Sequence, residues 1–248
     1  MDVERAVIND CEAFFFPARG STPGQPVGLL LAGLRSSTVL GRFSDWTEAW
    51  QAAGYAIASY DFKDDRYTWG ADAGVATFSE LLEAARQRWA VRRPIVCGSS
   101  RGGLTALVWA HRNRGVPAAW FGMNPVMNLG PFYDLEGRAT SLNAAYGIEN
   151  KAELIRDVCP VANPVDLAAD LVRLPMRTWQ GRDDEVTPPS ELAKFDAGVR
   201  EAGGSHSITY GPGGHATADG PRAQFEASAQ IAFAQQAEGG AARALRPG

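Results

Sequence analysis

The sequence predicts an α/β fold with a mostly parallel, eight-stranded sheet and helices on both of its faces. From Val27 onward, short apolar segments alternate with amphipathic segments, an order typical of parallel strands joined by helices. The segment VGLLLA at 27–32 is continuously apolar, as expected for a strand that is buried on both faces. A glycine-rich turn, GSSRG at 98–102, separates an apolar segment from a helical one. Together these features favour strands that end in functional loops.

The predicted elements begin with an antiparallel hairpin of two strands at 3–8 and 11–17, followed by a turn at 20–26. The other strands are expected at 27–32, 55–60, 94–97, 118–123, 176–180 and 205–210. Helices are expected at 43–53, 77–91, 103–114, 151–158, 190–202 and 222 to about 237. Prolines recur between 124 and 174, so this segment is expected to be less regular apart from the helix at 151–158.

Length and composition indicate one globular domain. A chain of 248 residues fits one large α/β domain, which we predict at 1–240 with a frayed tail at 241–248. Aliphatic and aromatic residues make up 45% and charged residues 21%, a balance that excludes a disordered or collagen-like chain. The net charge of -4 provides no attraction for nucleic acid or for an anionic membrane surface.

Cysteine usage and the first residues favour a cytoplasmic location. Cys11, Cys97 and Cys159 show no CxxC spacing and no pairing with histidine that suits zinc, so we expect buried, reduced thiols and no metal. The segment MDVERAVIND lacks the apolar core of a signal peptide. No segment reaches the ~18 apolar residues of a membrane span. We therefore expect no membrane contact.

The turn at 98–102 matches the pattern Gly-x-Ser-x-Gly, which presents a nucleophilic serine when it lies between a strand and a helix. Ser100 would occupy a strained turn that lifts its hydroxyl clear of the sheet. The residues two before and two after Ser100 come close to neighbouring backbone, so Gly98 and Gly102 are the sizes that fit. The following helix directs its first N–H groups toward negative charge that develops beside Ser100.

A serine nucleophile requires a base, and three histidines are available. His111 lies eleven residues along the helix after Ser100, about 16 Å away, and is interpreted as a helix-end cation or a surface residue. His206 opens the last strand at the opposite edge of the sheet and is interpreted as a surface strand residue. His215 follows that strand in the loop GPGGHATADG, at the edge where Ser100 lies. We therefore predict that His215 is the base.

The acid that orients the histidine is expected after another strand. The strand at 176–180 leads into GRDDEVTP, where Asp184 is preferred because a strand-Gly-x-x-Asp-x-Val turn commonly aims its fourth residue at the histidine loop. Asp183 would then be a surface or capping carboxylate, and Asp134 remains a third option.

An oxyanion formed by attack on a carbonyl needs hydrogen-bond donors. One is expected to be the backbone N–H of Arg101, directly after the nucleophile. The second is expected in the loop after 27–32, where Leu34 is the first candidate and Arg35 the second.

The order Ser100, Asp184, His215 is that of the α/β-hydrolases, and the chain resembles this superfamily over nearly its whole length. Within it, GRDDEVTPP followed by GPGGH is similar to the esterase and prolyl-oligopeptidase-like branch, and more loosely to the dienelactone-hydrolase-like enzymes. The usual His-Gly after the third strand is replaced by Ala32-Gly33. The loop after the fourth strand reads DFKDDRYTWG instead of a short Gly-containing turn.

The resemblance implies a small cap at about 124–174, between the sixth and seventh strands. Apolar residues there are candidates for an acyl or leaving-group pocket, and the alternative is that they pack the cap onto the core. These candidates are Met123, Met127, Leu129, Phe132, Tyr133 and Tyr146. The side chains of Arg35 and Arg101 are candidates for binding a substrate carboxylate or phosphate. The alternative is pairing with an acid such as Asp45, Asp64 or Asp65.

These residues and the resemblance imply a serine hydrolase that cleaves a small-molecule carboxylic ester, thioester or lactone without a cofactor. A peptidase or amidase is the alternative, although peptidases of this branch usually carry a large extra domain for which 248 residues leave no room. A carbon–carbon bond hydrolase or lyase with the same residues also stays open. So does a non-catalytic binding protein, although such relatives typically lack one of the three residues. We expect a monomer or a homodimer.

Overall fold

The structure is a computed structural model, and it describes residues 3–22, 24–34, 44–215 and 220–244. Its centre is one eight-stranded sheet with the order β1-β2-β4-β3-β5-β6-β7-β8. The strands are β1 Glu4–Ile8, β2 Cys11–Phe16, β3 Gly28–Gly33, β4 Tyr55–Tyr60, β5 Ile95–Ser99, β6 Ala119–Met123, β7 Met176–Gly181 and β8 His206–Gly211. The predicted mostly parallel sheet is therefore confirmed.

The pairing of the strands explains which segments of the sequence are continuously apolar. β1 and β2 form the predicted antiparallel hairpin, and β2 also runs antiparallel to β4. From β4 to β8 all neighbouring strands are parallel. Every residue of β3 and β4 is buried, because these inner strands are covered on both faces. Parallel strands end at the same edge, so the carboxyl ends of β3, β5, β7 and β8 lie along one edge of the sheet.

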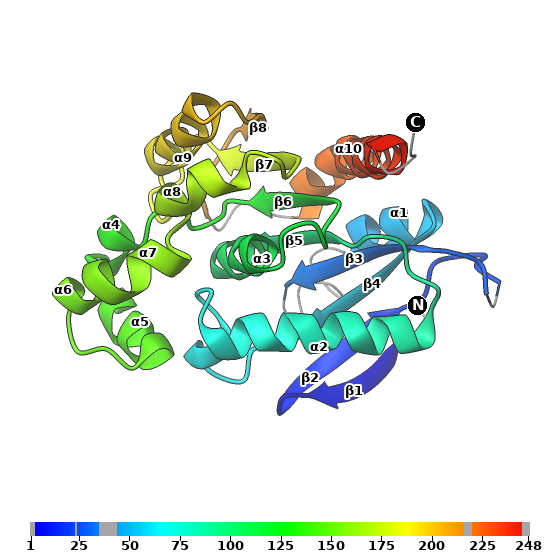
Figure 1. Cartoon of the computed structure of the whole chain (residues 1–248), viewed down its shortest axis with the longest axis horizontal. Coiled ribbons are helices and arrows are strands. Elements are labelled where there is room, and N and C mark those ends of the chain that lie inside the picture. Colours follow the sequence, from blue (N-terminus) through cyan, green and yellow to red (C-terminus); the bar gives the residue numbers. More distant parts are fainter. Residues whose placement is uncertain (1–2, 23, 35–43, 216–219, 245–248) are drawn as a thin grey trace.

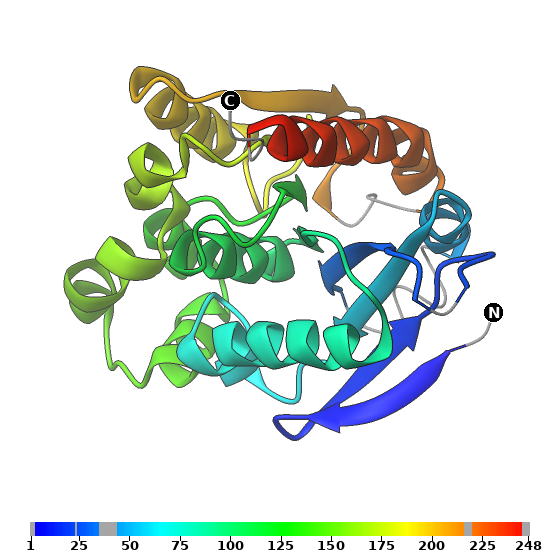
Figure 2. The ribbon, with the colours of Figure 1, turned by 45° about the vertical axis from the view of Figure 1, so that its right-hand side comes forward.

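Helices cover both faces of the sheet, as Figures 1 and 2 show. They include α1 Ser44–Ala52, α2 Asp72–Arg88, α3 Arg101–Arg112, α9 Pro189–Glu201 and α10 Gly220–Ala244. On one face the apolar sides of α2, α3 and α9 bury Phe78, Trp109 and Phe195. On the other face α1 and α10 lie together, and the indole N–H of Trp46 donates to Gln230 Oε1 at 2.7 Å. The two apolar clusters hold the sheet from both sides.

Several predicted boundaries are corrected. The helix predicted at 77–91 begins at Asp72, and its first turn contains Gly74, a weak helix former. A Cβ on Gly74 would lie 2.7 Å from the carbonyl oxygen of Tyr67, so close packing accounts for the glycine. The final helix runs on to Ala244, beyond its predicted end near 237 and into the predicted tail, whose residues 245–248 lie outside the described residues. Phe43, the predicted start of the first helix, also lies outside them.

The segment between β6 and β7 is more helical than predicted, and in Figure 1 its first helices lie beside the main sheet. It contains α4 Leu129–Tyr133, α5 Arg138–Tyr146, α6 Lys151–Glu153, a π-helix at Leu154–Val158, α7 Cys159–Ala162, α8 Pro164–Leu167 and a 3₁₀-helix at Ala168–Leu171. Pro164 stands in the first turn of α8, where a missing N–H costs no intrahelical hydrogen bond. Pro160 instead lies inside a continuous helical run at 151–162, directly after the π-helix. The expectation that prolines make this segment irregular is therefore corrected.

The three cysteines are free and buried, as expected. Burial raises the pKa of Cys97 well above its ordinary value, so this thiol in β5 stays protonated. Within the described ranges, no helix is both long and apolar enough to cross a bilayer.

Candidate active site

Ser100 occupies a strained turn between β5 and α3. Its φ of 53° and ψ of -126° lie in a region that residues with a side chain rarely adopt. The turn is held by backbone hydrogen bonds. Ser100 N–H donates to Met123 O at 3.1 Å, and Ser100 O accepts from Val126 N–H at 3.2 Å. The strain is therefore maintained by the ends of β6 and the cap segment.

The glycines beside Ser100 are required by close approach of the backbone, as predicted. A Cβ on Gly98 would lie 2.4 Å from the carbonyl carbon of Gly102. A Cβ on Gly102 would lie 1.9 Å from the carbonyl oxygen of Gly33, at the end of β3. Any side chain at either position would force the turn apart.

The structure brings the three predicted chemical residues together. His215 Nε2 lies 2.9 Å from Ser100 Oγ, and His215 Nδ1 lies 2.9 Å from Asp184 Oδ2. The network assigns the proton to Nδ1, so that Nδ1–H donates to the carboxylate and Nε2 accepts from the serine hydroxyl. The Asp184 side chain is fully buried, whereas that of His215 is 23% exposed. The imidazole thus connects a buried anion with a nucleophile that solvent can reach.

The Asp184 carboxylate is held by several donors. Oδ1 accepts from the backbone N–H groups of Val186 at 2.9 Å and Thr187 at 2.8 Å. Oδ2 accepts from Thr187 Oγ1 at 2.7 Å and from Gln180 Nε2 at 3.3 Å, in addition to His215. Burial raises the pKa of Asp184, but the hydrogen bonds from His215 and Thr187 outweigh it and lower this pKa below its ordinary value. Asp184 is therefore ionised at neutral pH.

The competing acids lie elsewhere. Asp183 is exposed and accepts a hydrogen bond from Gly213 N–H at 3.0 Å, which matches the predicted capping carboxylate. Asp134 forms an ion pair with Lys151 in the cap segment.

The other histidines have structural partners. His111 lies near the end of α3, with Nε2 3.0 Å from Asp170 Oδ2. His206 lies at the start of β8, as predicted, but the prediction that it is a surface residue is wrong. Its ring is buried against Phe195 of α9, and its Nε2 lies 2.8 Å from Thr178 Oγ1. The outer strand is covered by α9 at this point.

The two predicted oxyanion donors belong to segments that pack against each other. Arg101 is the first residue of α3, where helical N–H groups have no intrahelical acceptor. Leu34 directly follows Gly33, whose carbonyl oxygen presses against Gly102. The Leu34 side chain is buried at 3% exposure, which anchors this end of the loop. Arg35, the second candidate, lies outside the described residues.

The Arg101 side chain pairs with an acid, as the alternative interpretation expected. Its Nη1 lies 2.9 Å from Asp65 Oδ1, in a 3₁₀ turn at Asp65–Tyr67. The guanidinium also lies over the rings of Phe62 and Trp69, 5.7 and 5.6 Å from their centroids. Arg101 therefore joins the start of α3 to the loop between β4 and α2.

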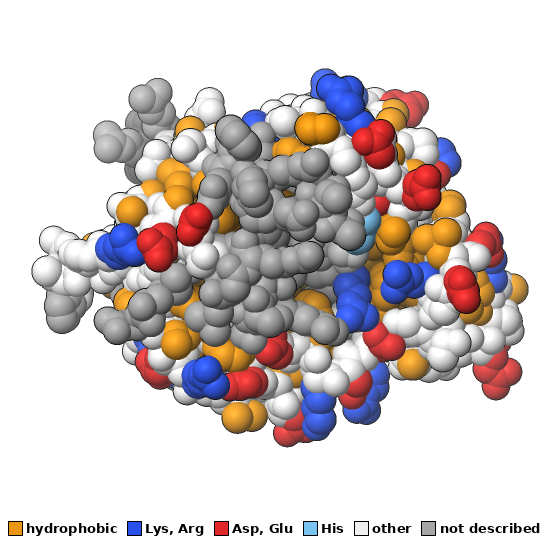
Figure 3. All heavy atoms as spheres, turned by 180° about the vertical axis from the view of Figure 1, so that it is seen from behind, with side chains coloured by type: hydrophobic (Ala, Val, Ile, Leu, Met, Phe, Trp, Pro, Cys, Tyr) orange, Lys and Arg blue, Asp and Glu red, His pale blue; other side chains and the backbone are white. Residues whose placement is uncertain are grey.

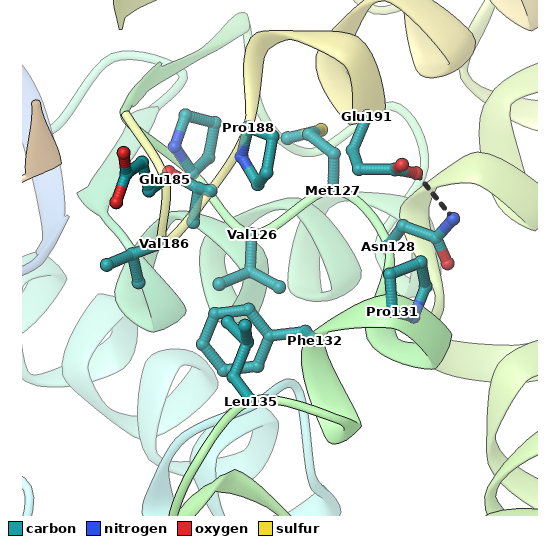
Figure 4. A pocket seen from close by; sticks show the side chains of 12 residues that line it. Val126, Met127, Asn128, Pro131, Phe132, Leu135, Glu185, Val186, Pro188 and Glu191 are labelled. Carbon is teal, nitrogen blue, oxygen red and sulfur yellow. Dashed lines mark hydrogen bonds between the residues drawn. The ribbon is translucent and has the colours of Figure 1, made fainter. Parts of the chain in front are cut away.

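A pocket of about 120 Å³ is lined by residues next in sequence or in contact with the three residues, although none of the three lines it (Figure 4). Met127 and Phe132, two of the predicted substrate-binding residues, line it. Its other lining residues are Pro125, Val126, Asn128, Pro131, Leu135, Glu185, Val186, Thr187, Pro188 and Glu191. Val126 N–H donates to the backbone oxygen of Ser100, and Thr187 binds Asp184, so two lining residues of the pocket contact the three residues. In Figure 4 the Asn128–Glu191 hydrogen bond lies at one side of the pocket and Glu185 at the other.

The remaining predicted pocket residues lie elsewhere. Met123 packs with Phe121 in the cluster beneath α1 and α10, on the other face of the sheet. Tyr133 turns its hydroxyl toward Asn143 Oδ1 of α5, to which it donates at 3.0 Å. On the face seen in Figure 3, hydrophobic side chains and cationic ones gather next to a histidine.

The sequence predictions missed three residues that build the site. Gln180 and Thr187 contact the Asp184 carboxylate. Asn124, with a φ of 44°, accepts from Gly181 N–H at 2.7 Å through Oδ1 and thereby joins the ends of β6 and β7. Asparagine tolerates positive φ better than most residues, so Asn124-Pro125 directly after a strand was the available signal. Among the described residues, no group of three or more His, Cys, Asp or Glu side chains suits a metal ion.

Known proteins match this chain in structure and not in sequence. No protein-family model and no curated protein sequence matches it. A puromycin-hydrolyzing peptidase of Mycobacterium tuberculosis is 17% identical, with a TM-score of 0.76 over 96% of this chain. An S-formylglutathione hydrolase of Staphylococcus aureus is 14% identical, with a TM-score of 0.73 over 96% of this chain. A fungal esterase of Rhizomucor miehei is also 14% identical, with a TM-score of 0.68 over 95% of this chain.

The matches cover different shares of these proteins. This chain spans 39% of the length of the puromycin-hydrolyzing peptidase, 98% of the S-formylglutathione hydrolase and 82% of the fungal esterase. At these identities the likeness concerns the fold. The chain has the α/β-hydrolase fold, as predicted.

Proposed function

We propose that this protein is a serine hydrolase that cleaves a carboxylic ester, thioester or lactone through an acyl-enzyme. One observation carries the proposal: His215 lies 2.9 Å from both Ser100 Oγ and Asp184 Oδ2. A binding protein gains nothing from a serine held at φ 53° against an imidazole whose other nitrogen contacts a buried carboxylate. The same arrangement suits nucleophilic catalysis.

The geometry supports a two-step mechanism. Ser100 Oγ attacks the substrate carbonyl while His215 Nε2 accepts its proton and then delivers it to the leaving alcohol or thiol. Asp184 holds Nδ1–H and stabilises the imidazolium. In the second step a water molecule attacks the acyl-enzyme carbonyl. His215 accepts the proton of this water and delivers it to Ser100 Oγ, which is released from the acyl group. The N–H groups of Arg101 and Leu34 are proposed as the oxyanion donors.

The pocket supports a compact apolar group on the substrate. Its walls are mainly Val126, Met127, Phe132, Leu135 and Val186, and its volume is about 120 Å³. A cavity of roughly 150 Å³ holds benzene, so we propose that the pocket takes a branched or cyclic group of about five or six carbon atoms. Such a group would be positioned next to Ser100 by binding energy that the carbonyl itself does not provide.

Amide or peptide hydrolysis is the second candidate. The observation that favours it is that a puromycin-hydrolyzing peptidase matches the fold with a TM-score of 0.76, beside 0.73 for the S-formylglutathione hydrolase. The same three residues serve either reaction, because amide cleavage differs in the leaving group that His215 must protonate.

Labelling and a substrate panel test both candidates. A fluorophosphonate probe is expected to label the wild type, and labelling that persists in Ser100→Ala would refute the assignment. Full turnover in His215→Ala would refute it as well. A panel of p-nitrophenyl esters with acyl chains of increasing length, run beside aminoacyl amides, then separates the candidates. Turnover of esters alone supports the esterase, whereas comparable turnover of the amides supports the peptidase.

A further inference from the structure

The Thr187 side chain contacts two of the three proposed reacting residues, Asp184 and His215. Its side chain is buried, with 5% of the residue exposed. Its Oγ1 lies 2.7 Å from Asp184 Oδ2, 3.2 Å from His215 Nδ1 and 3.2 Å from Asn124 O. Thus one hydroxyl faces the acid, the base and the end of β6.

The hydroxyl has one proton, and the distances indicate where it goes. The shortest contact is to Asp184 Oδ2, the oxygen that also accepts from His215 Nδ1–H at 2.9 Å. Thr187 and His215 therefore donate to the same carboxylate oxygen. When two donors share one buried carboxylate oxygen, each interacts with it more weakly than a single donor would.

The Thr187 backbone fixes this arrangement. Its N–H donates to Asp184 Oδ1 at 2.8 Å, so Thr187 binds both oxygens of the carboxylate. Its carbonyl oxygen accepts from Gln180 Nε2 at 2.8 Å, which ties it to β7. Rotation of the carboxylate would break contacts on both sides.

We propose that Thr187 is a positioning residue that fixes the Asp184 carboxylate and, through it, sets the basicity of His215. The proposal rests on the function proposed for Ser100 and His215. Thr187 also lines the apolar pocket, so a group bound there would contact the residue that holds the Asp184 carboxylate. One residue thereby connects the substrate pocket with the acid–base pair.

The other charged residues described at 182–185 are exposed, and two of them have partners other than His215. Asp183 is exposed and bonded to Gly213 N–H. Arg182 is exposed and lies over the Tyr210 ring, 5.9 Å from its centroid. Glu185 is exposed at the pocket. Among the described residues, Asp184 is the charged group in hydrogen-bond contact with the imidazole, and Thr187 acts on that charge.

The test compares Thr187→Val, which keeps the shape but removes the hydroxyl, with Thr187→Ser, which keeps the hydroxyl. Thr187→Ala serves as a second hydroxyl-free variant. Thr178→Val is the matched control, because Thr178 is a buried threonine whose Oγ1 lies 2.8 Å from another histidine, His206. The readouts are the NMR titration of His215, assigned by its loss in His215→Ala, and the pH profile of kcat/KM.

Without the hydroxyl, the carboxylate interacts more strongly with the imidazolium. In Thr187→Val we expect the His215 midpoint and the acid limb of kcat/KM to rise by about half a pH unit. We expect kcat to fall roughly tenfold as the pair loses its alignment. Thr187→Ser should restore the wild-type profile, and Thr178→Val should leave it unchanged.

An unchanged His215 midpoint in both hydroxyl-free variants would overturn the proposal. So would equal changes in Thr187→Val and Thr187→Ser, since the hydroxyl would then not be the responsible group. The NMR titration requires no turnover, so it decides the role of Thr187 at His215 independently. Wild-type turnover in Ser100→Ala would instead contradict the proposed function.

Discussion

The carbonyl oxygen of Gly33 lies 1.9 Å from the position that a Cβ atom on Gly102 would occupy. The end of β3 and the first turn of α3 are therefore in direct backbone contact. Leu34 directly follows Gly33 and Arg101 directly precedes Gly102, so this contact joins the two segments that carry the proposed oxyanion donors. The two N–H groups proposed for the oxyanion thus depend on the absence of one side chain.

Gly102→Ala is expected to lower kcat/KM by roughly 100-fold, because the added methyl group must separate the two segments that carry the oxyanion donors. The free energy of unfolding should fall by about 1–3 kcal/mol through overpacking. Gly239→Ala is the control: nothing lies within 4 Å of its Cβ position in α10. It should stabilise the protein by roughly 0.5–1 kcal/mol, as measured by urea unfolding. Equal effects of the two substitutions would contradict the prediction.

Asp184→Asn and its neighbour Asp183→Asn should differ sharply. The asparagine at 184 retains the size but can no longer hold an ionised acceptor against His215, so kcat is expected to fall by roughly 10³–10⁴. Asp183 is exposed and bonds only a backbone N–H in the contacts described above, so kcat should change by less than about threefold. Steady-state kinetics at pH 7.5 on one ester measure both. A large loss of kcat in Asp183→Asn would indicate that Asp183, and not Asp184, is the acid that orients His215.

The buried His206 should make stability depend on pH. Burial lowers its pKa from 6.5 to about 4, while Asp196 opposes this shift. The unfolded chain therefore binds a proton that the folded protein excludes. Stability is full above pH 6.5 and is lost as the pH falls through 6.5 toward 4, by at most roughly 3 kcal/mol. Urea unfolding at a series of pH values measures this loss, which His206→Gln should reduce. An equally steep loss in the variant would assign it to other groups.

Arg101→Ala tests whether the guanidinium recognises the substrate. Because Arg101 pairs with Asp65 and lies over Trp69, its removal should loosen the loop between β4 and α2. We expect roughly 1–2 kcal/mol lower stability and an equal loss of kcat/KM on neutral and carboxylate-bearing esters. Asp65→Asn should reproduce part of this effect. A loss confined to carboxylate-bearing esters would show that Arg101 binds the substrate anion.

Leu135→Trp should narrow the proposed pocket with little effect on folding, because Leu135 is 36% exposed on the pocket rim. Turnover of esters with five or six acyl carbons is expected to fall about tenfold, while acetyl esters should be unaffected. The acyl-chain panel measures the change in the optimum. A uniform loss over all chain lengths would mean that this pocket does not hold the acyl group.

The strands and the position of Ser100, Asp184 and His215 were predictable for one physical reason. Buried parallel strands appear as continuous apolar segments, and their loops meet at one edge, so residues directly after strands are neighbours. The exclusion of His206 from the site followed from the same reasoning. Its burial did not, because that depends on α9 covering β8 with Phe195, a contact between side chains that sequence spacing does not report.

The cap helices and Thr187 were hidden by ambiguous local signals. Pro164 is compatible with both a loop and a first helical turn, and Pro160 lies inside a helical run, where a proline is not expected. Thr187 before Pro188 resembles the start of a helix, and nothing in that pattern indicates that its hydroxyl turns back toward Asp184. Such a contact depends on the backbone path of the whole turn from Gly181.

The hydrogen bond between Trp46 and Gln230 joins residues 184 positions apart. During synthesis on the ribosome, α1 and the sheet face beneath it emerge long before α10, which covers them. Until α10 has been translated, the side chains of Trp46 and Trp50 therefore remain exposed or are covered only transiently. A nascent chain that ends before residue 220 should bind a holdase chaperone through this face, even though the segments that carry Ser100, Asp184 and His215 are already complete.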